Sequence, residues 1–363
     1  MKRILLLGCT GSIGTNTLQI VRNMIEDFTI CGLQCHSNEN RLLELSEEFN
    51  KCPILLTSKD SSKEAFQNLI EQSKPDIVVN GIAGADGLLP SKIVLENGID
   101  LALANKETIV MAGSLIKELA SKNNAKLIPV DSEHSAIFSL INQCGKENIS
   151  KVIITASGGP FRTFTREQLN AVSIEQALNH PTWKMGPKIT VDSSTLANKG
   201  LEVIEASYLF DLKAEQIEVV IHPQSLIHSL VRTNDGILYA QISDPDMKHP
   251  ILNALTWPKN SKNYLKEFDL FDQTMTFYKP RYNDFPLLNF AFECIKLGNA
   301  YTIAFNAANE IAVHAFLENK ITYTTISRIV RYVLDKNWNI PVKNFEDVYE
   351  IDRKARIIAK EQI

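Results

Sequence analysis

The sequence predicts an α/β protein with an N-terminal parallel sheet, a central α/β domain that carries a lid loop, and a C-terminal helical domain. In residues 1–130, apolar runs such as "RILLLG", "FTICGL" and "DIVVNGIAG" alternate with amphipathic stretches, a pattern typical of βαβ units. A further strand-like run, "KVIITASGGPF", opens the central part. Beyond residue 281, apolar residues recur at helical spacing, which predicts a closing helical domain.

Length and composition limit the functional classes. A chain of 363 residues predicts more than one domain. The net charge of -4 gives no electrostatic reason to expect nucleic acid as a partner. Six cysteines without a CxxC pair indicate reduced thiols in a cytoplasmic compartment. The opening "MKRILLLG" is too short for a signal peptide, and no run is long enough to span a bilayer, so we expect no membrane partner.

A glycine turn follows the first predicted strand. In "GCTGSIG", Gly8, Gly11 and Gly14 separate that strand from the helix "TNTLQIVRNMI". Glycines at a helix N-terminus let backbone amides approach a pyrophosphate, so the turn predicts a Rossmann-like dinucleotide site. Its spacing is GxxGxxG, which differs from the commoner GxGxxG.

The end of the second strand bears on which dinucleotide binds. Enzymes that select NAD usually place an acid at this point, and "LQCHSNENR" has none at the strand tip. Ser37, Asn38 and Arg41 offer groups for a 2′-phosphate, although Glu39 lies among them. The segment therefore favours NADP.

Two acids follow the apolar run "KLIPV". If Asp131 and Glu133 continued the strand, they would point to the same side and repel each other unless a cation or a proton lay between them. The alternative is a solvated strand end or an N-cap of the helix "HSAIFSLINQ". His134 is expected to pack or to orient its neighbours.

The segment 180–190 contains "HPTWKMGPK", which predicts an irregular loop that could close as a lid over a ligand. Trp183 would lie in this lid, or alternatively serve as a surface aromatic. If the next helix begins near Ser194 or Thr195, then Asn198, Lys199 and Glu202 share one side of it. This supplies a third acid with a cation and an amide, or alternatively an ordinary exposed ion pair.

The remaining chain contains three segments with apolar stripes, "NFAFECIKLG", "AFNAANEIAVHAFLENK" and "TISRIVRYVLDK", which predict helices. Residues 256–280 show little periodicity and are interpreted as a connector. The predicted division is 1–130 for cofactor binding, 131–255 for catalysis and metal binding, 256–280 for the connector, and 281–363 for the helical domain.

Taken together, these stretches resemble the 1-deoxy-D-xylulose 5-phosphate reductoisomerase family. The resemblance is carried by "GCTGSIG", "GIAGADGLLP", "LANKET", "VDSEHSAIF", "ASGGPF", "HPTWKMGPKITVDSSTLANKGLEVIEA", "DPDMKHPILNALTWP" and "FNAANEIAVHAFL". They occur in the family's order and cover nearly the whole chain. The long central stretch is the most specific, because it combines the lid, a phosphate site and one metal ligand.

The resemblance implies a site for Mg²⁺ or Mn²⁺ formed by Asp131, Glu133 and Glu202. A set of carboxylate oxygens suits these hard cations. The implied catalytic residues are Lys106, Asp131, Glu133, His180 and Glu202. The implied substrate-binding residues are Lys106, Ser132, Glu133, Ser157, His180, Trp183, Ser193, Asn198, Lys199 and Glu202.

For the cofactor, the resemblance implies NADPH bound by Thr10, Gly11, Ser12, Ile13, Ser37, Asn38, Asn105, Lys106, Glu107 and Gly186. One departure concerns the second strand tip. The family commonly has glycine and then lysine or asparagine there, whereas this chain has His36 and Ser37, which removes a cation from the expected 2′-phosphate site.

The implied activity is rearrangement and NADPH-dependent reduction of 1-deoxy-D-xylulose 5-phosphate to 2-C-methyl-D-erythritol 4-phosphate, in the non-mevalonate isoprenoid pathway. We expect a homodimer in a bacterial cytoplasm, without a signal or transit peptide. A simple NADP-dependent dehydrogenase of another phosphorylated sugar or semialdehyde is the alternative, since it would share the cofactor domain without needing three carboxylates. A non-catalytic dinucleotide sensor is a second alternative.

Overall fold

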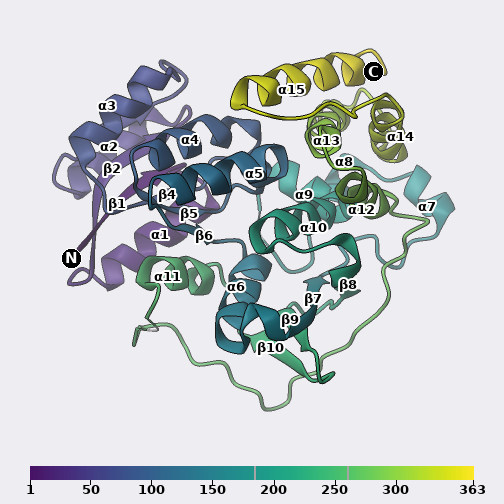
Figure 1. Cartoon of the computed structure of the whole chain (residues 1–363), viewed down its shortest axis with the longest axis horizontal. Helices are drawn as coiled ribbons and strands as arrows, with labels where there is room; N and C mark the ends of the chain where they lie inside the picture. Colours follow the sequence, from purple (N-terminus) through teal and green to yellow (C-terminus); the bar gives the residue numbers. More distant parts are fainter. Residues whose placement is uncertain (184, 260) are drawn as a thin grey trace. The chain divides into compact units, whose positions relative to one another are not determined.

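The computed structural model describes residues 1–183, 185–259 and 261–363, and Figure 1 shows the course of the chain. Lys184 of the predicted lid and Asn260 of the predicted connector lie outside the described residues. The chain forms two compact units. The first unit comprises Met1–Thr108, Ile116–Ser135 and Asp246–Glu267, and the second comprises Ile109–Leu115, Ala136–Pro245 and Phe268–Ile363. Each unit combines segments that are distant in sequence. The predicted functional division of the chain into four consecutive stretches is not tested by these units and stays a prediction.

The first unit is built on a six-stranded sheet whose strand pairs are all parallel, as the sequence predicted. The strands are β1 (Lys2–Leu7), β2 (Phe28–Cys35), β3 (Ile54–Leu56), β4 (Ile77–Asn80), β5 (Asp100–Leu103) and β6 (Leu127–Pro129). Their order is β3-β2-β1-β4-β5-β6. The chain thus builds outward on one side of β1 and then returns to its other side, and ligands of such sheets bind where the order reverses.

Helices cover the strands of this sheet. They are α1 (Ser12–Asn23), α2 (Glu39–Glu48), α3 (Lys63–Ser73), α4 (Leu88–Glu96), α5 (Lys106–Lys122) and α11 (Lys248–Thr256), with the short 3-10 helix η1 (Ala85–Gly87). Residues Ile109–Leu115 of α5 belong to the second unit. Ile4, Leu5, Leu6 and Leu7 are at most 1% exposed, as expected when helices pack on both faces of a parallel sheet. The late helix α11 packs against α1, and the Lys2 ammonium donates to the Leu255 carbonyl (2.6 Å).

The glycine turn after β1 requires glycine at two positions, Gly8 and Gly14. Gly8 has φ +77°, in the left-handed region that favours glycine. A Cβ on Gly14 would lie 2.4 Å from the Gly8 carbonyl oxygen and 2.5 Å from Cys9 backbone atoms. Gly11, which has no side chain to cap the helix, is the N-cap of α1. The first amides of α1 are therefore available to an anionic group.

The second unit contains a four-stranded mixed sheet in the order β10-β9-β7-β8. Its strands are β7 (Ile149–Ala156), β8 (Ile217–Ile221), β9 (Ile227–Thr233) and β10 (Leu238–Ile242). The helices around it are α6 (Ser132–Cys144), which begins in the first unit, α7 (Arg166–Asn170), α8 (Ile174–Leu178), α9 (Pro187–Ser194) and α10 (Ala197–Phe210), with the 3-10 helices η2 (Lys146–Asn148) and η3 (Ala214–Gln216). Within this sheet β7 and β8 pair in parallel, and the β7–β9 and β9–β10 pairs are antiparallel.

Four helices close the second unit: α12 (Leu287–Leu297), α13 (Tyr301–Leu317), α14 (Tyr323–Leu334) and α15 (Phe345–Lys360). Three of them match the predicted segments, whereas α15 was not singled out from the sequence. The almost fully buried α13 packs against both α14 and α15. Across the described residues between α11 and α12 there is no helix or strand, and Tyr278 forms only an isolated bridge with Ile221.

Two predicted boundaries were wrong. The lid was expected to be irregular through residue 190, but α9 begins at Pro187, because proline fits the first position of a helix. The following helix begins at Ala197 instead of Ser194 or Thr195. Leu196 adopts a left-handed conformation (φ 59°) that separates α9 from α10.

The six cysteines are free, and five of them are buried. Within the described ranges, none of the helices combines the length and the apolar character needed to cross a bilayer.

We expect Gly14→Ala to lower the free energy of unfolding by about 3 kcal/mol, because backbone atoms must move to admit the methyl group. Gly11→Ala is the matched control in the same turn, since its Cβ would lie 3.4 Å from the Gly8 carbonyl oxygen, an ordinary contact. Chemical denaturation of both variants measures the difference. Equal stability of the two variants would contradict this account of the turn.

Candidate active site

The predicted cofactor residues of the first unit follow three strands at the same edge of the parallel sheet. Residues 10–13 come after β1, Ser37 and Asn38 after β2, and residues 105–107 after β5. Carboxyl ends of parallel strands share one edge, where open α/β sheets bind their ligands. The topology therefore gathers these segments, which are far apart in the sequence.

The tip of β2 carries its charges in local pairs. Asn38 caps α2 by accepting the Arg41 amide at its side-chain oxygen (3.2 Å). The Glu39 carboxylate pairs with Lys59 (2.7 Å), and the Arg41 guanidinium pairs with Glu44 (2.7 Å). The Ser37 side chain is exposed. Glu39, which weighed against NADP in the sequence, is thus partly neutralised by a neighbouring lysine.

Asn105 fixes the segment after β5. Its side-chain amide donates to the carbonyls of Ile82 and Gly84 (2.8 Å each), and its oxygen accepts the Thr108 amide at the start of α5 (2.8 Å). Only 2% of Asn105 is exposed. Because it ties the loop after β4 to the first turn of α5, it holds the backbone of Lys106 and Glu107 in place.

Asp131 and Glu133 lie at the junction of β6 and α6. The expectation that the two carboxylates meet at one spot is confirmed, since an oxygen of each lies within 4.8 Å of the other. The strand argument behind it was wrong, because β6 ends at Pro129 and Glu133 is already in the first turn of α6. The Asp131 carbonyl accepts the Ser135 amide (2.8 Å), and its carboxylate accepts the Ser132 amide (3.0 Å). Asp131 thus lies directly before α6, the place that the alternative interpretation as an N-cap gave it. The positive end of the helix dipole favours the charged form of both acids.

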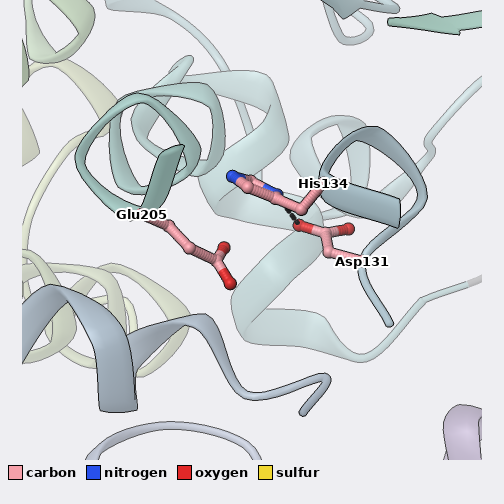
Figure 2. Close-up of side chains that lie close together, drawn as sticks. All are labelled: Asp131, His134 and Glu205. Carbon is pink, nitrogen blue, oxygen red and sulfur yellow. Dashed lines mark ion pairs between the residues drawn. The ribbon is translucent and has the colours of Figure 1, made fainter. Parts of the chain in front are cut away.

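Lys106 and His134 surround the Asp131 carboxylate. The Lys106 ammonium lies 2.8 Å from Asp131 Oδ2, and only 5% of Lys106 is exposed. His134 Nδ1 lies 3.5 Å from the same oxygen, and the dashed line in Figure 2 marks this pair. Burial disfavours the charged carboxylate, but Lys106 and His134 outweigh it and hold the pKa of Asp131 well below its ordinary value. Asp131 is therefore a carboxylate at neutral pH, and the fully buried His134 packs beside it.

In the second unit, a serine and two glycines follow β7. Gly158 (φ +84°) and Gly159 (φ +66°) turn the chain, and a Cβ on Gly159 would lie 2.8 Å from the Ser193 carbonyl oxygen. The turn therefore brings Ser157 close to the end of α9. His180 bridges the two serines, since its Nε2 lies 3.1 Å from both the Ser157 and the Ser193 hydroxyl oxygens.

The hydrogen bonds of His180 define its tautomer. Nδ1 accepts the backbone amides of Thr182 (3.1 Å) and Trp183 (2.9 Å), so it carries no proton. The proton of the neutral ring therefore sits on Nε2 and faces the serine hydroxyls. Burial lowers the pKa of His180 below its ordinary value of 6.5. Trp183 is partly buried, with its ring 6.5 Å from that of His228, unlike the surface aromatic of the alternative interpretation.

The first turns of α10 hold the predicted amide, cation and acid together. Lys199 forms an ion pair with Glu202, and the Asn198 side-chain amide donates to the same carboxylate. Lys199 is 4% and Glu202 1% exposed, so the alternative of an ordinary exposed ion pair was wrong. Removing one partner of such a buried pair leaves a costly uncompensated charge.

A polar layer that the sequence analysis missed lies beside Ser193. Asp192, which is 1% exposed, pairs with Lys188 (2.8 Å) and accepts the side-chain amide of Asn309 on α13 (2.8 Å). The hydroxyl of Tyr323 donates to the Ser194 carbonyl (2.7 Å). The helical part of the second unit thus anchors the end of α9, which presents Ser193. In the sequence, the one indication of this polar layer was "FNAANE", where the predicted helical spacing turns polar residues toward the interior.

The candidate residues divide between the units. The first unit carries Lys106, Asp131, Ser132 and Glu133 with the cofactor segments, and the second carries Ser157, His180, Trp183, Gly186, Ser193, Asn198, Lys199 and Glu202. The three predicted metal ligands are likewise divided, with Glu202 in the second unit. Glu205, also drawn in Figure 2, belongs to the second unit and is 1% exposed.

The strand order and glycine turn of the first unit define a dinucleotide-binding protein of the doubly wound α/β class. Family models of 1-deoxy-D-xylulose 5-phosphate reductoisomerase match residues 4–65 and 59–113, and those of its C-terminal domains match 127–210 and 242–358. This chain belongs to the 1-deoxy-D-xylulose 5-phosphate reductoisomerase family.

Individual relatives agree along the whole chain. The 1-deoxy-D-xylulose 5-phosphate reductoisomerase of Treponema denticola is 50% identical over 371 residues, covering 100% of this chain and 97% of the relative. That of Pelodictyon phaeoclathratiforme is 44% identical, with 100% of both chains covered. A crystal structure of DOX-P reductoisomerase with NADPH, fosmidomycin and magnesium is 36% identical (TM-score 0.91), covering 100% of this chain and 98% of the other. The Zymomonas mobilis enzyme with NADPH is also 36% identical (TM-score 0.90), covering 99% and 98%.

We expect the imidazole of His180 to titrate below pH 6.5 and to carry its proton on Nε2 when neutral, because burial and two backbone donors to Nδ1 oppose protonation. Its contribution to stability is present above the unfolded pKa and is lost as pH falls through the lower folded pKa. Nitrogen NMR of the labelled protein measures both properties, with His180→Asn to assign the signal. A midpoint above 6.5 or a proton on Nδ1 would contradict the hydrogen-bond pattern.

Proposed function

We propose that this chain converts 1-deoxy-D-xylulose 5-phosphate to 2-C-methyl-D-erythritol 4-phosphate with NADPH and Mg²⁺ or Mn²⁺, in non-mevalonate isoprenoid biosynthesis. The observation that carries the proposal is the 50% identity to a reductoisomerase over the whole chain. A simple dehydrogenase of another phosphorylated sugar would not account for similarity that extends through the acidic motif, the lid and the helical domain.

NADPH is proposed to bind at the carboxyl edge of the parallel sheet. The N-terminus of α1, with Thr10, Gly11, Ser12 and Ile13, supplies amides for the pyrophosphate. Ser37 and Asn38 would receive the adenosine ribose phosphate, and the nearby Glu39 carboxylate is paired with Lys59. Asn105, Lys106 and Glu107 would lie near the nicotinamide, with Gly186 from the lid.

The divalent cation is proposed to bind Asp131, Glu133 and Glu202. The donor set fits, because all three are carboxylates, Asp131 is held ionised, and hard cations prefer oxygen ligands. Lys106 and Lys199 would balance the negative charge of these acids before the cation binds. When bound, the cation would polarise the ketone and the adjacent hydroxyl of the substrate, and the nicotinamide would supply the hydride.

The substrate phosphate is proposed to bind Ser157, Ser193, Asn198 and Lys199. Hydroxyl, amide and ammonium groups are suited to a phosphate dianion. His180 already links the two serines, so its Nε2 proton is positioned to donate to the same anion. A neutral imidazole donates without adding a charge.

The remaining residues orient the substrate and exclude water. Lys106 and Ser132 lie beside the proposed cation ligands and would contact the substrate's oxygens. His180 and Trp183, in the segment before α9, would cover the bound substrate as a lid. Water would thereby be kept away from the aldehyde that the rearrangement produces, until it is reduced.

We further propose a homodimer that forms along β10. This strand lies at the edge of its sheet, and four large apolar side chains on or beside it are 38–51% exposed: Ile237, Leu238, Tyr239 and Ile242. An exposed apolar edge strand is a template for pairing, and a second copy offers the same edge. Light scattering that gives the mass of a single chain would contradict this proposal.

The chain is proposed to act in the cytoplasm without a nucleic-acid or membrane partner. The six free cysteines suit a reducing compartment. A net charge of -4 gives no general attraction for a polyanion.

We expect Glu202→Gln to reduce kcat with Mg²⁺ by about 100-fold or more, because one of three anionic ligands is lost at nearly constant shape. NADPH affinity should stay within about twofold of the wild type, since Glu202 belongs to the proposed metal site. Metal titrations of turnover and NADPH fluorescence titrations measure the two effects. Exposed Glu215, changed to Gln, is the matched control. Full activity of Glu202→Gln at limiting Mn²⁺ would refute the assignment.

We expect Ser193→Ala to raise the KM for 1-deoxy-D-xylulose 5-phosphate by about tenfold, the usual effect of losing one hydrogen bond to a charged group. The KM for NADPH should not change. The adjacent Ser194 is a matched control, because its hydroxyl donates to the Val191 carbonyl within α9 (2.7 Å). Steady-state kinetics of the two variants would show equal effects if Ser193 were only structural.

A further inference from the structure

A pocket in the second unit lies outside the proposed active site. It has a volume of about 660 Å³, within the range of small-molecule sites. Its walls come from the turn after β7, the residue before α10, the end of β8 and the chain between α11 and α12. The proposed phosphate ligands Ser157, Ser193, Asn198 and Lys199 do not line it.

The irregular segment that forms one wall is held firmly in place. Tyr278 exchanges two backbone hydrogen bonds with Ile221 (2.8 and 2.9 Å). The Gln224 side chain bonds both the amide and the hydroxyl of Thr276, and His222 stacks on Phe277 with ring centroids 4.8 Å apart. These contacts form the wall before any ligand arrives, which lowers the entropic cost of binding.

The charged side chains that line the pocket are all cationic: Arg162, Lys279 and Arg281. Arg281 is neutralised by Asp284 (2.7 Å), and it donates to the Arg162 carbonyl (2.8 Å), which fixes the backbone there. Within the described residues, neither Arg162 nor Lys279 takes part in an ion pair. These two exposed cations therefore remain available to a ligand of the pocket.

The inner lining is apolar. Leu196 and Phe285 are each 3% exposed and Ile221 is 6% exposed, so the apolar surface is continuous with the core of the unit. Apolar walls with a few convergent charges are characteristic of sites for organic ligands. An inorganic anion would contact only the cationic side chains and would leave the apolar lining exposed to water.

We propose that the pocket is a second ligand site, for a small phosphate monoester with an apolar or aromatic body. The phosphate group contacts the Arg162 guanidinium and the Lys279 ammonium, which are suited to a dianion. The body packs on Leu196, Ile221 and Phe285. The proposal is independent of the reaction, because none of these residues belongs to the proposed substrate or metal site.

Phenyl phosphate is the probe, and calorimetry of the full-length protein is the measurement. Phenyl phosphate should bind more tightly than inorganic phosphate, which lacks the aromatic body, and more tightly than phenol, which lacks the phosphate group. In the double variant Arg162→Gln/Lys279→Gln the Kd should rise about tenfold or more, because two charge-assisted contacts are lost. Exposed Lys296, changed to Gln, removes a charge from the same unit outside the pocket and should leave the Kd unchanged.

A further variant separates this site from the proposed active site. Asn198→Ala should retain the binding that the double variant loses. Loss of binding in Asn198→Ala with retention in the double variant would overturn the proposal, since the probe would then occupy the substrate phosphate site. Equal affinity for phenyl phosphate and inorganic phosphate would overturn it as well, because the apolar lining would contribute nothing.

Discussion

The parallel hydrogen-bond ladder of the first unit is the constraint on which the candidate site depends. Because β1, β2, β4, β5 and β6 run in one direction, the segments that follow them emerge at one edge of the sheet. The glycine turn, the tip of β2, Asn105 and Asp131 share that edge for this reason. A strand inserted in the opposite direction would remove its following segment from the site while leaving the core equally apolar.

A second constraint is that buried charges need partners, and here the partners are other site residues. Lys106 with Asp131, and Lys199 with Glu202, are pairs in which each lysine is at most 5% exposed. Such pairs stabilise little in net terms, because desolvation offsets their attraction. Their value is geometric, since each cation fixes the position of its acid. Asp192 follows the same rule outside the reacting groups, where Lys188 and Asn309 hold it beside Ser193.

The sequence predicted the parallel sheet, the glycine turn and three of the closing helices, because apolar periodicity and glycine placement act locally. The predictions from the sequence were wrong at the boundaries between elements. Asp131 and Glu133 were treated as neighbours on a strand, yet β6 ends at Pro129 and α6 begins at Ser132. The break between α9 and α10 depends on the left-handed Leu196, a conformation that an apolar residue adopts only when its surroundings require it.

By itself the sequence determined the class of the first unit and the residue types of the proposed cofactor, metal and substrate sites. Through its long motifs it also determined the family. These follow from short-range rules, since spacing along a strand or helix decides which side chains share a face. Tertiary structure alone decided the burial of Lys199 and Glu202 and the anchoring of α9 by Asn309 and Tyr323. Each of these requires segments far apart in the chain to meet, and their contacts leave no regular spacing in the sequence.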